Sequence, residues 1–192
     1  YLFVAAAALG MVACNGNKPG YVITGTVEGA ADGDTVFLQE VVGRQLSKLD
    51  TAIITKGTFT FEGVQDSAVN RYITSGKGNE ALLIDFFLEN GKINIALTRD
   101  NDSATGTANN DAYQEIRNKI NALNQKATPL YESMRSADIT DEQKEANMKE
   151  LEKLEEELGQ VYKEGIEKNI TNPVGIHLFK SNYYNMTTAE ND

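Results

Sequence analysis

The sequence predicts an α+β fold, in which an antiparallel β-sandwich or barrel-like domain precedes a helical hairpin and a third short helix. Two observations support this prediction. Apolar and polar residues alternate with period two over residues 21–107, between glycine-containing turns, and this alternation is typical of antiparallel strands. After Gly106 the apolar residues recur every three or four positions, which is the spacing of one helix face.

Seven strands are expected, over the ranges 21–28, 35–42, 46–55, 58–62, 70–75, 81–89 and 92–98. The turns between them include Asp32-Gly33-Asp34, Lys56-Gly57 and Asn90-Gly91. Asn-Gly favours the positive φ values of a type I′ turn, so we expect a tight hairpin at Asn90-Gly91. Residues two apart share a face of a strand, and this spacing predicts the core. Its expected members are Ile23, Val27, Phe59, Phe61, Ile93, Ile95 and Leu97.

The first predicted helix carries an apolar stripe from Tyr113 to Met134. Pro129 lies inside this stripe, so the helix should kink or break near Thr128. The third helix should begin at Asn172-Pro173, since asparagine caps a helix well and proline suits its first turn.

The second helix should begin at Thr140-Asp141-Glu142-Gln143, which has the pattern of a capping box. Its apolar stripe comprises Met148, Leu151, Leu154, Leu158, Val161 and Ile166. The segment before it is short, so the first two helices should pair as an antiparallel hairpin. Between Asp141 and Lys168 the chain carries 10 acidic and 5 basic side chains. This run predicts either a solvated face with i to i+4 ion pairs, such as Glu145–Lys149 and Glu164–Lys168, or an acidic docking surface.

The charge of the chain argues against nucleic acid as a partner. Its 18 Lys and Arg residues against 28 Asp and Glu residues give a net charge of -10. Such a charge repels the phosphate backbone and releases none of its counterions. We therefore expect no nucleic-acid partner.

Cys14 is the only cysteine of the 192 residues and follows a run of 13 residues, Tyr1 to Ala13, that is almost entirely apolar. A polar segment follows it, and this order is typical of a bacterial lipoprotein signal that ends at its lipidated cysteine. The run is too short to span a bilayer, which takes roughly 18 to 20 residues. Neither an initiator Met nor a basic segment precedes Tyr1, so we expect the signal to begin upstream. An incidental or buried cysteine is the alternative.

These boundaries divide the chain into a signal peptide at 1–13, a tether at 14–20, a β domain at 21–107 and a helical segment at 108–192. The predicted location is the cell envelope, where a lipid on Cys14 would hold the protein to a membrane, facing the periplasm.

Few residues are candidates for catalysis, metal binding or ligand binding. His177 is the single histidine and has no second imidazole or thiol nearby in the sequence, so an ordinary surface or interface histidine is expected. The Asp100-Asn101-Asp102-Ser103 segment lacks the glycine and glutamate of a calcium loop and predicts an Asx turn. Asp85 interrupts the apolar run of residues 82–88. One interpretation is a ligand-facing carboxylate, and the other is a carboxylate that lies on the half-exposed face of its strand or is paired. We expect no catalytic residue, metal or cofactor.

The strands and turns resemble a known family. The segments that carry the likeness are Tyr21-Val22-Ile23-Thr24-Gly25, Asp32-Gly33-Asp34-Thr35-Val36-Phe37-Leu38, Asp50-Thr51-Ala52, Gly57-Thr58-Phe59-Thr60-Phe61-Glu62-Gly63 and Phe87-Leu88-Glu89-Asn90-Gly91. Together they resemble the domain-of-unknown-function module at the N-terminus of thiol-disulfide interchange lipoproteins of Bacteroidota. In that family a helical segment follows, and then a thioredoxin-like domain with a Cys-x-x-Cys pair. The given sequence stops at Asp192 without such a pair.

The resemblance implies a non-catalytic, membrane-tethered module of a thioredoxin-like oxidoreductase, which would position a redox domain beyond Asp192 or recognise its protein client. The alternative is a stand-alone lipoprotein binding module for a glycan or a peptide. The sequence contains no Trp, which counts modestly against glycans, because indole rings are favoured platforms for sugars.

The lipid anchor makes a direct prediction. Cys14→Ser should leave the protein unlipidated and largely soluble, because acyl chains on this residue would be its only strong membrane attachment. Labelling cells with a fatty-acid probe measures the effect. Equal incorporation into the wild type and the variant would contradict the anchor.

Overall fold

The computed structural model describes residues 20–76 and 81–189, so Cys14 and the predicted signal lie outside the described residues. The strands are β1 (Tyr21–Val27), β2 (Thr35–Val42), β3 (Gln45–Ile53), β4 (Phe59–Gly63), β5 (Val69–Ser75), β6 (Leu82–Leu88), β7 (Gly91–Leu97) and β8 (Ser103–Thr105). The helices are α1 (Ala108–Met134), α2 (Asp141–Lys168) and α3 (Pro173–Ala189).

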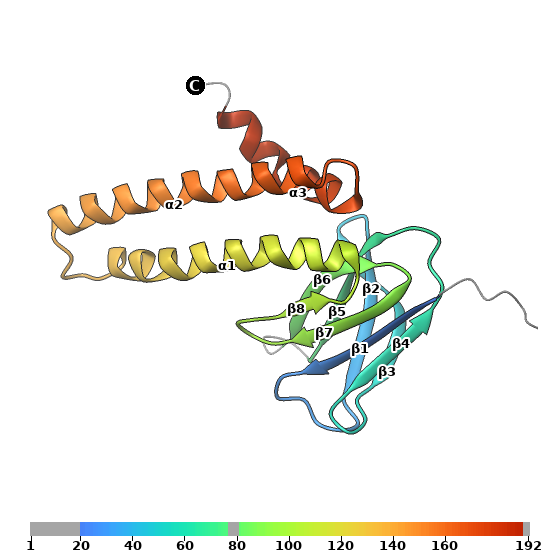
Figure 1. The fold of residues 1–192 in the computed structure, drawn as a ribbon. Helices are drawn as coiled ribbons and strands as arrows, with labels where there is room; N and C mark the ends of the chain where they lie inside the picture. Colours follow the sequence, from blue (N-terminus) through green and yellow to red (C-terminus); the bar gives the residue numbers. More distant parts are fainter. Residues whose placement is uncertain (1–19, 77–80, 190–192) are drawn as a thin grey trace, which may run out of the picture.

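The strands form two four-stranded sheets that pack as a sandwich (Figure 1). The β1 sheet has the order β4-β1-β7-β8, and the β2 sheet has the order β3-β2-β5-β6. The predicted α+β fold is therefore confirmed as a sandwich, and the described strands do not close into a barrel. Strands β6 and β8 each form one edge of a sheet, and α1 begins next to both.

One strand pair departs from the antiparallel prediction. β1 and β7 run parallel over their whole length, from Tyr21↔Gly91 to Val27↔Leu97. Parallel neighbours require a long connection, and here the strands β2 to β6 supply it in place of a helix. The other strand pairs are antiparallel.

The predicted tight hairpin at Asn90-Gly91 is wrong. β6 and β7 belong to different sheets, and the dipeptide carries the chain from one to the other. The Asn90 side chain pairs with the backbone of Gln65, accepting from its N–H at 2.9 Å and donating to its carbonyl at 2.7 Å. The Gly91 N–H donates to the Gly20 carbonyl at 3.0 Å. Contacts distant in the sequence thus override the local turn preference.

The two-residue turn with positive φ lies at Lys56-Gly57 instead, with φ values of 53° and 75°. Thr55 and Thr58 exchange backbone hydrogen bonds across it. Both amides of the turn donate to the carboxylate of Asp32, at 2.9 and 2.8 Å. These bonds lower the pKa of Asp32 and attach the turn to the β1–β2 loop.

The core between the sheets contains the residues that strand periodicity predicted. Six are at most 3% exposed: Ile23, Phe59, Phe61, Ile93, Ile95 and Leu97. Val27, the seventh, is half-buried and packs against this cluster. Phe87 is also buried but faces the helices, where it packs with Ile116, Val174 and Leu178 in a second cluster.

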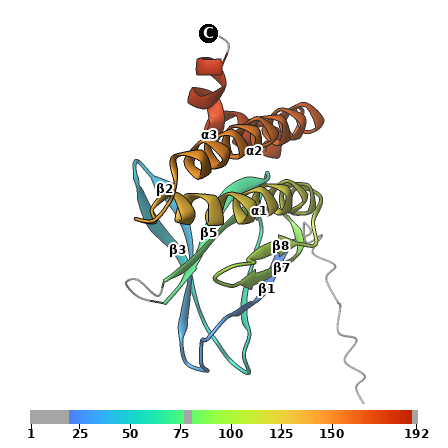
Figure 2. The ribbon, with the colours of Figure 1, turned by 90° about the vertical axis from the view of Figure 1, so that its left-hand side faces the viewer.

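Helices α1 and α2 form the expected antiparallel hairpin on one side of the sandwich, and α3 packs against both (Figure 2). Two details differ from the prediction. α1 continues through Pro129 without a break, and Met148 is 52% exposed and does not join the packed stripe of α2. Of the helices in the described part of the chain, none is long and apolar enough to span a bilayer.

The caps of α2 and α3 are as predicted. Thr140 and Gln143 form the reciprocal capping box, and the Asn172 side chain accepts from the amide of Val174 at 3.0 Å.

Of the two predicted ion pairs on α2, one forms: Glu145 pairs with Lys149 at 2.8 Å. Lys168, expected to pair with Glu164, reaches across to Glu115 on α1 at 3.1 Å, so this ion pair joins the two helices.

Two carboxamides near the start of α1 cover the open sheet edges. Asn110 accepts from the N–H of Phe87 on β6 and donates to its carbonyl, both at 2.8 Å. Gln114, one turn later, accepts from the N–H of Ala104 on β8 at 2.9 Å and donates to the Asp102 carbonyl at 3.5 Å. Each carboxamide therefore forms the hydrogen bonds with the edge strand that a neighbouring strand would form.

Asn110→Ala should lower the free energy of unfolding by about 2–4 kcal/mol, because it leaves two buried backbone groups of Phe87 without partners. Urea denaturation measures this loss. Asn124→Ala is the matched control, because Asn124 is exposed on the same helix and alanine favours helix there. Equal stability of the two variants would show that the edge bonds contribute nothing.

Candidate functional site

Two polar sites lie along α1, and the first surrounds Asp85 on β6. The Asp85 side chain points away from the sandwich core, towards the helices. The Tyr113 hydroxyl donates to its Oδ2 at 2.9 Å, and the His177 Nε2 of α3 lies 3.4 Å from the same oxygen. Arg117 of α1 approaches Oδ1 at 3.7 Å and donates to the Asp85 backbone carbonyl at 3.1 Å.

The electrostatics of this cluster keep Asp85 charged and Tyr113 protonated. Burial alone raises the pKa of Asp85, but the bonds from His177 and Tyr113 and the charge of Arg117 outweigh it and lower the pKa. Burial, together with the nearby Asp85 charge, strongly raises the pKa of Tyr113. The Tyr113 hydroxyl is therefore a permanent hydrogen-bond donor to Asp85.

Aromatic rings enclose the cluster. Phe87, Tyr113 and His177 meet edge to face in all three pairings, with ring centroids 5.3 to 5.7 Å apart. Arg117 lies over the Tyr113 ring and pairs with Asp102 in the turn just before β8. The cluster therefore joins β6, α1, α3 and the segment before β8 through two carboxylates, Asp85 and Asp102, and one guanidinium.

Asp85 is thus a paired carboxylate on the face of the strand opposite the core, as one of the two sequence interpretations proposed. His177 is an interface histidine. All the polar groups of the cluster bond to one another, which suits a structural junction better than a reaction centre. Its residue types resemble those of an acid–base site, but of these residues Asp102 alone lines the groove described next.

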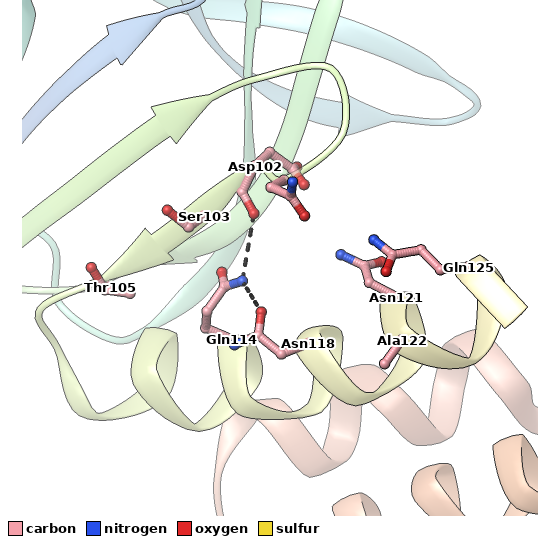
Figure 3. Close-up of a pocket in the computed structure, with 9 residues that line it drawn as sticks. Asp102, Ser103, Thr105, Gln114, Asn118, Asn121, Ala122 and Gln125 are labelled. Carbon is pink, nitrogen blue, oxygen red and sulfur yellow. Dashed lines mark hydrogen bonds between the residues drawn. The ribbon is translucent and has the colours of Figure 1, made fainter.

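The second site is an open groove of about 440 Å³ between α1 and the end of the β1 sheet (Figure 3). Asn101 and Asp102 from the β7–β8 turn form one wall, together with Ser103 and Thr105 of β8. Ala104 between them is buried in the core, so the two hydroxyl side chains share the opposite face of the strand.

The other wall is a row of carboxamides on α1. Gln114, Asn118, Asn121 and Gln125 line it, at helical steps of four, three and four. Gln114 donates to Asn118 Oδ1 at 2.9 Å. Figure 3 shows the amides of Asn121 and Gln125 directed across the groove towards the turn that carries Asp102. Neither has a side-chain hydrogen bond to any residue that the structure describes.

Sequence reasoning missed this groove. The apolar stripe of α1 was recognised, but the amide stripe beside it, Asn110, Gln114, Asn118, Asn121 and Gln125, has the same helical period. A count of Asn and Gln at steps of three and four would have found it.

The remaining candidates from the sequence are the Asp100–Ser103 segment and possible metal ligands. Asp102 of the Asp100–Ser103 segment pairs with Arg117, and the Asn101 amide donates to Thr98 Oγ1 at 3.0 Å. Within residues 20–76 and 81–189, no group of three His, Cys, Asp or Glu side chains could hold a metal ion.

Comparison with known families identifies the strand-rich part of the chain. Residues 21–113 match the family model described as a domain of unknown function (DUF4369). This segment is therefore a domain of unknown function, and it includes the sandwich and the start of α1 through Tyr113. No curated protein matches the chain.

The Asp85 cluster predicts a pH dependence. The folded pKa of Asp85 is lowered from its usual range, so its stabilising contribution is present above the ordinary aspartate pKa of about 4 and is lost as the pH falls through the folded pKa. The difference in unfolding free energy between the wild type and Asp85→Asn should therefore narrow from pH 7 to pH 3, measured by urea denaturation. Asp138→Asn at an exposed loop position controls for the loss of one charge. A difference that stays constant would contradict the role of Asp85.

Proposed function

We propose that this chain is a non-catalytic recognition module, which Cys14 tethers to a membrane of the cell envelope, facing the periplasm. The observation that carries the proposal is the open groove along α1. Its amides are positioned by a rigid frame, and two of them have no partner among the described residues. The Asp85 cluster, in contrast, satisfies itself and serves to hold the frame together.

The chemistry available to the chain supports a non-catalytic role. Thiol-disulfide exchange needs an attacking thiolate and a resolving thiol, and the sequence has one cysteine, which the lipid signal commits to acylation. The tether is supported by the apolar run before Cys14 and the polar segment after it.

The family resemblance supports a place for the module beside a thioredoxin-like domain. A helical segment ending in an Asn-Pro helix stands before the redox domain in that family, and Asn172-Pro173 begins α3 here. α3 is fixed to the sandwich through His177 and Leu178. A domain joined to α3 would be attached close to this fixed frame, and the module would position it or recognise its protein client.

The second candidate is a stand-alone binding module for a glycan or peptide. The groove favours this alternative, because it needs no other domain to bind a ligand. The gene sequence downstream of Asp192 separates the two candidates: a Cys-x-x-Cys-containing domain supports the first, and a stop codon supports the second.

Residues 15–192 should show no activity in an insulin-reduction assay, because they contain no cysteine. A longer product with a downstream Cys-x-x-Cys pair should reduce insulin readily. Loss of both downstream cysteines is the control, and it should bring the long product to the level of residues 15–192. Comparable turnover by residues 15–192 alone would overturn the non-catalytic assignment.

A further inference from the structure

The groove along α1 carries no free charge. Asp102 is its one ionisable lining residue, and its carboxylate is already paired with Arg117. A net charge of -10 over the whole chain also repels anions. The groove therefore suits a ligand that is neutral and binds through hydrogen bonds.

The groups in the groove match hydroxyl ligands well. A carboxamide presents a carbonyl acceptor beside an N–H₂ donor, and a hydroxyl both donates and accepts. Asn121 and Gln125 offer the first kind, and Ser103 and Thr105 the second. Adjacent hydroxyls of a sugar can meet such a carboxamide with one donated and one accepted bond.

A peptide fits the same surface poorly. A peptide strand would need the free edge of β8, but Gln114 already occupies the Ala104 N–H and the Asp102 carbonyl there. Peptide side chains would need apolar pockets, and Ala122 is the one apolar residue of the groove lining.

A row of neutral polar side chains continues from the groove across the whole outer face of the β1 sheet. The strand registers pair Thr105 with Asn94, Asn94 with Thr24, and Thr24 with Thr60. Directly paired residues point to the same face of a sheet. Thr24, Thr60 and Asn94 are exposed, and their side chains bond to nothing else in the described part of the chain. Three strand spacings give this row a length of about 14 Å.

From these features we infer that the groove and the row of Thr105, Asn94, Thr24 and Thr60 form a binding track for a linear, neutral oligosaccharide. The end of the sugar chain lies in the groove against Asn121 and Gln125, and the following units lie along the row. The inference rests on the second candidate above, a module that binds a glycan or a peptide, and gives its ligand a chemical class. With no aromatic ring in the groove lining, hydrogen bonds alone must compete with water. We therefore expect weak binding, with a dissociation constant of roughly 1 mM.

The test is an NMR titration of the full chain carrying Cys14→Ser. The probes are dimers and hexamers of β-1,4-glucose, α-1,4-glucose and β-1,4-mannose, each up to about 10 mM, about ten times the expected dissociation constant. We expect at least one sugar series to shift the amides of residues 101–105 and 114–125. The hexamer should bind several-fold tighter than the dimer, and 0.5 M NaCl should change neither affinity, because no ion pair is involved.

Substitutions separate the two parts of the track. Asn121→Leu with Gln125→Leu should abolish binding of both sugar lengths, while Asn124→Leu, exposed on the same helix, should leave it unchanged. Thr24→Val with Thr60→Val should reduce the affinity for the hexamer to that for the dimer and leave the dimer unaffected. Asn121→Asp, which keeps the side-chain shape and the fold but loses the N–H₂ donor, should weaken binding of both lengths.

Absence of shifts with all the sugars would overturn the inference. So would shifts in the groove caused by a neutral Gly-Ser hexapeptide but by none of the sugars, which would assign the site to peptides. Both results would leave the lipid on Cys14 and the insulin-reduction result untouched, so failure of the ligand class is distinguishable from failure of the proposed function.

Discussion

The fold depends on the way α1 covers one open edge of each sheet. A two-layer sandwich of four-stranded sheets leaves edge strands with free N–H and carbonyl groups. Here β6 and β8 lie at neighbouring edges, and Asn110 and Gln114, one turn apart on α1, supply the missing partners. A pair of carboxamides thus forms backbone hydrogen bonds that an additional strand would otherwise form. The start of α1 is therefore part of the β domain in its bonding, which agrees with a family match that extends to residue 113.

The Asp85 cluster extends this attachment to α3. A buried carboxylate is costly unless opposite charge and hydrogen bonds compensate for the loss of water. Arg117, Tyr113 and His177 provide that compensation, and each comes from a helix. Inside the fold, the charge on β6 is thus compensated mainly by groups on the helices, with one further hydrogen bond from Asn70 of β5 at 3.4 Å. These directional bonds fix the position of the helices relative to the sandwich. Apolar packing around Phe87 alone would allow the helices to pack in other orientations.

Local patterns in the sequence predicted the elements but not their partners. Period two identified the core residues Ile23, Phe59 and Leu97, and the capping box marked the start of α2, because these signals depend on near neighbours. The Asn90-Gly91 hairpin was wrong, because contacts from elsewhere in the chain decide the path there. Of the kink or break predicted near Thr128, the break does not occur, because α1 continues through Pro129.

The candidate site was harder to predict for the same reason. Asp85 was recognised as unusual from its apolar neighbours, but its partners Tyr113, Arg117 and His177 lie 28 to 92 positions away along the chain, and no local spacing relates them. The parallel pairing of β1 with β7 was equally out of reach, since strand periodicity does not report direction.

The groove follows from the geometry of the same helix. Side chains at steps of three and four share one face, so the face that brings Asn110 and Gln114 to the sheet edges also carries Asn118, Asn121 and Gln125. α1 extends past the sandwich in Figure 1, so the later amides of this face have no strand to bond to. The first amides of the row bond the sheet edges, and the later ones remain free to donate and accept hydrogen bonds. Because the sandwich fixes the first two amides, it also fixes the orientation of the free ones, and a ligand would meet them already positioned.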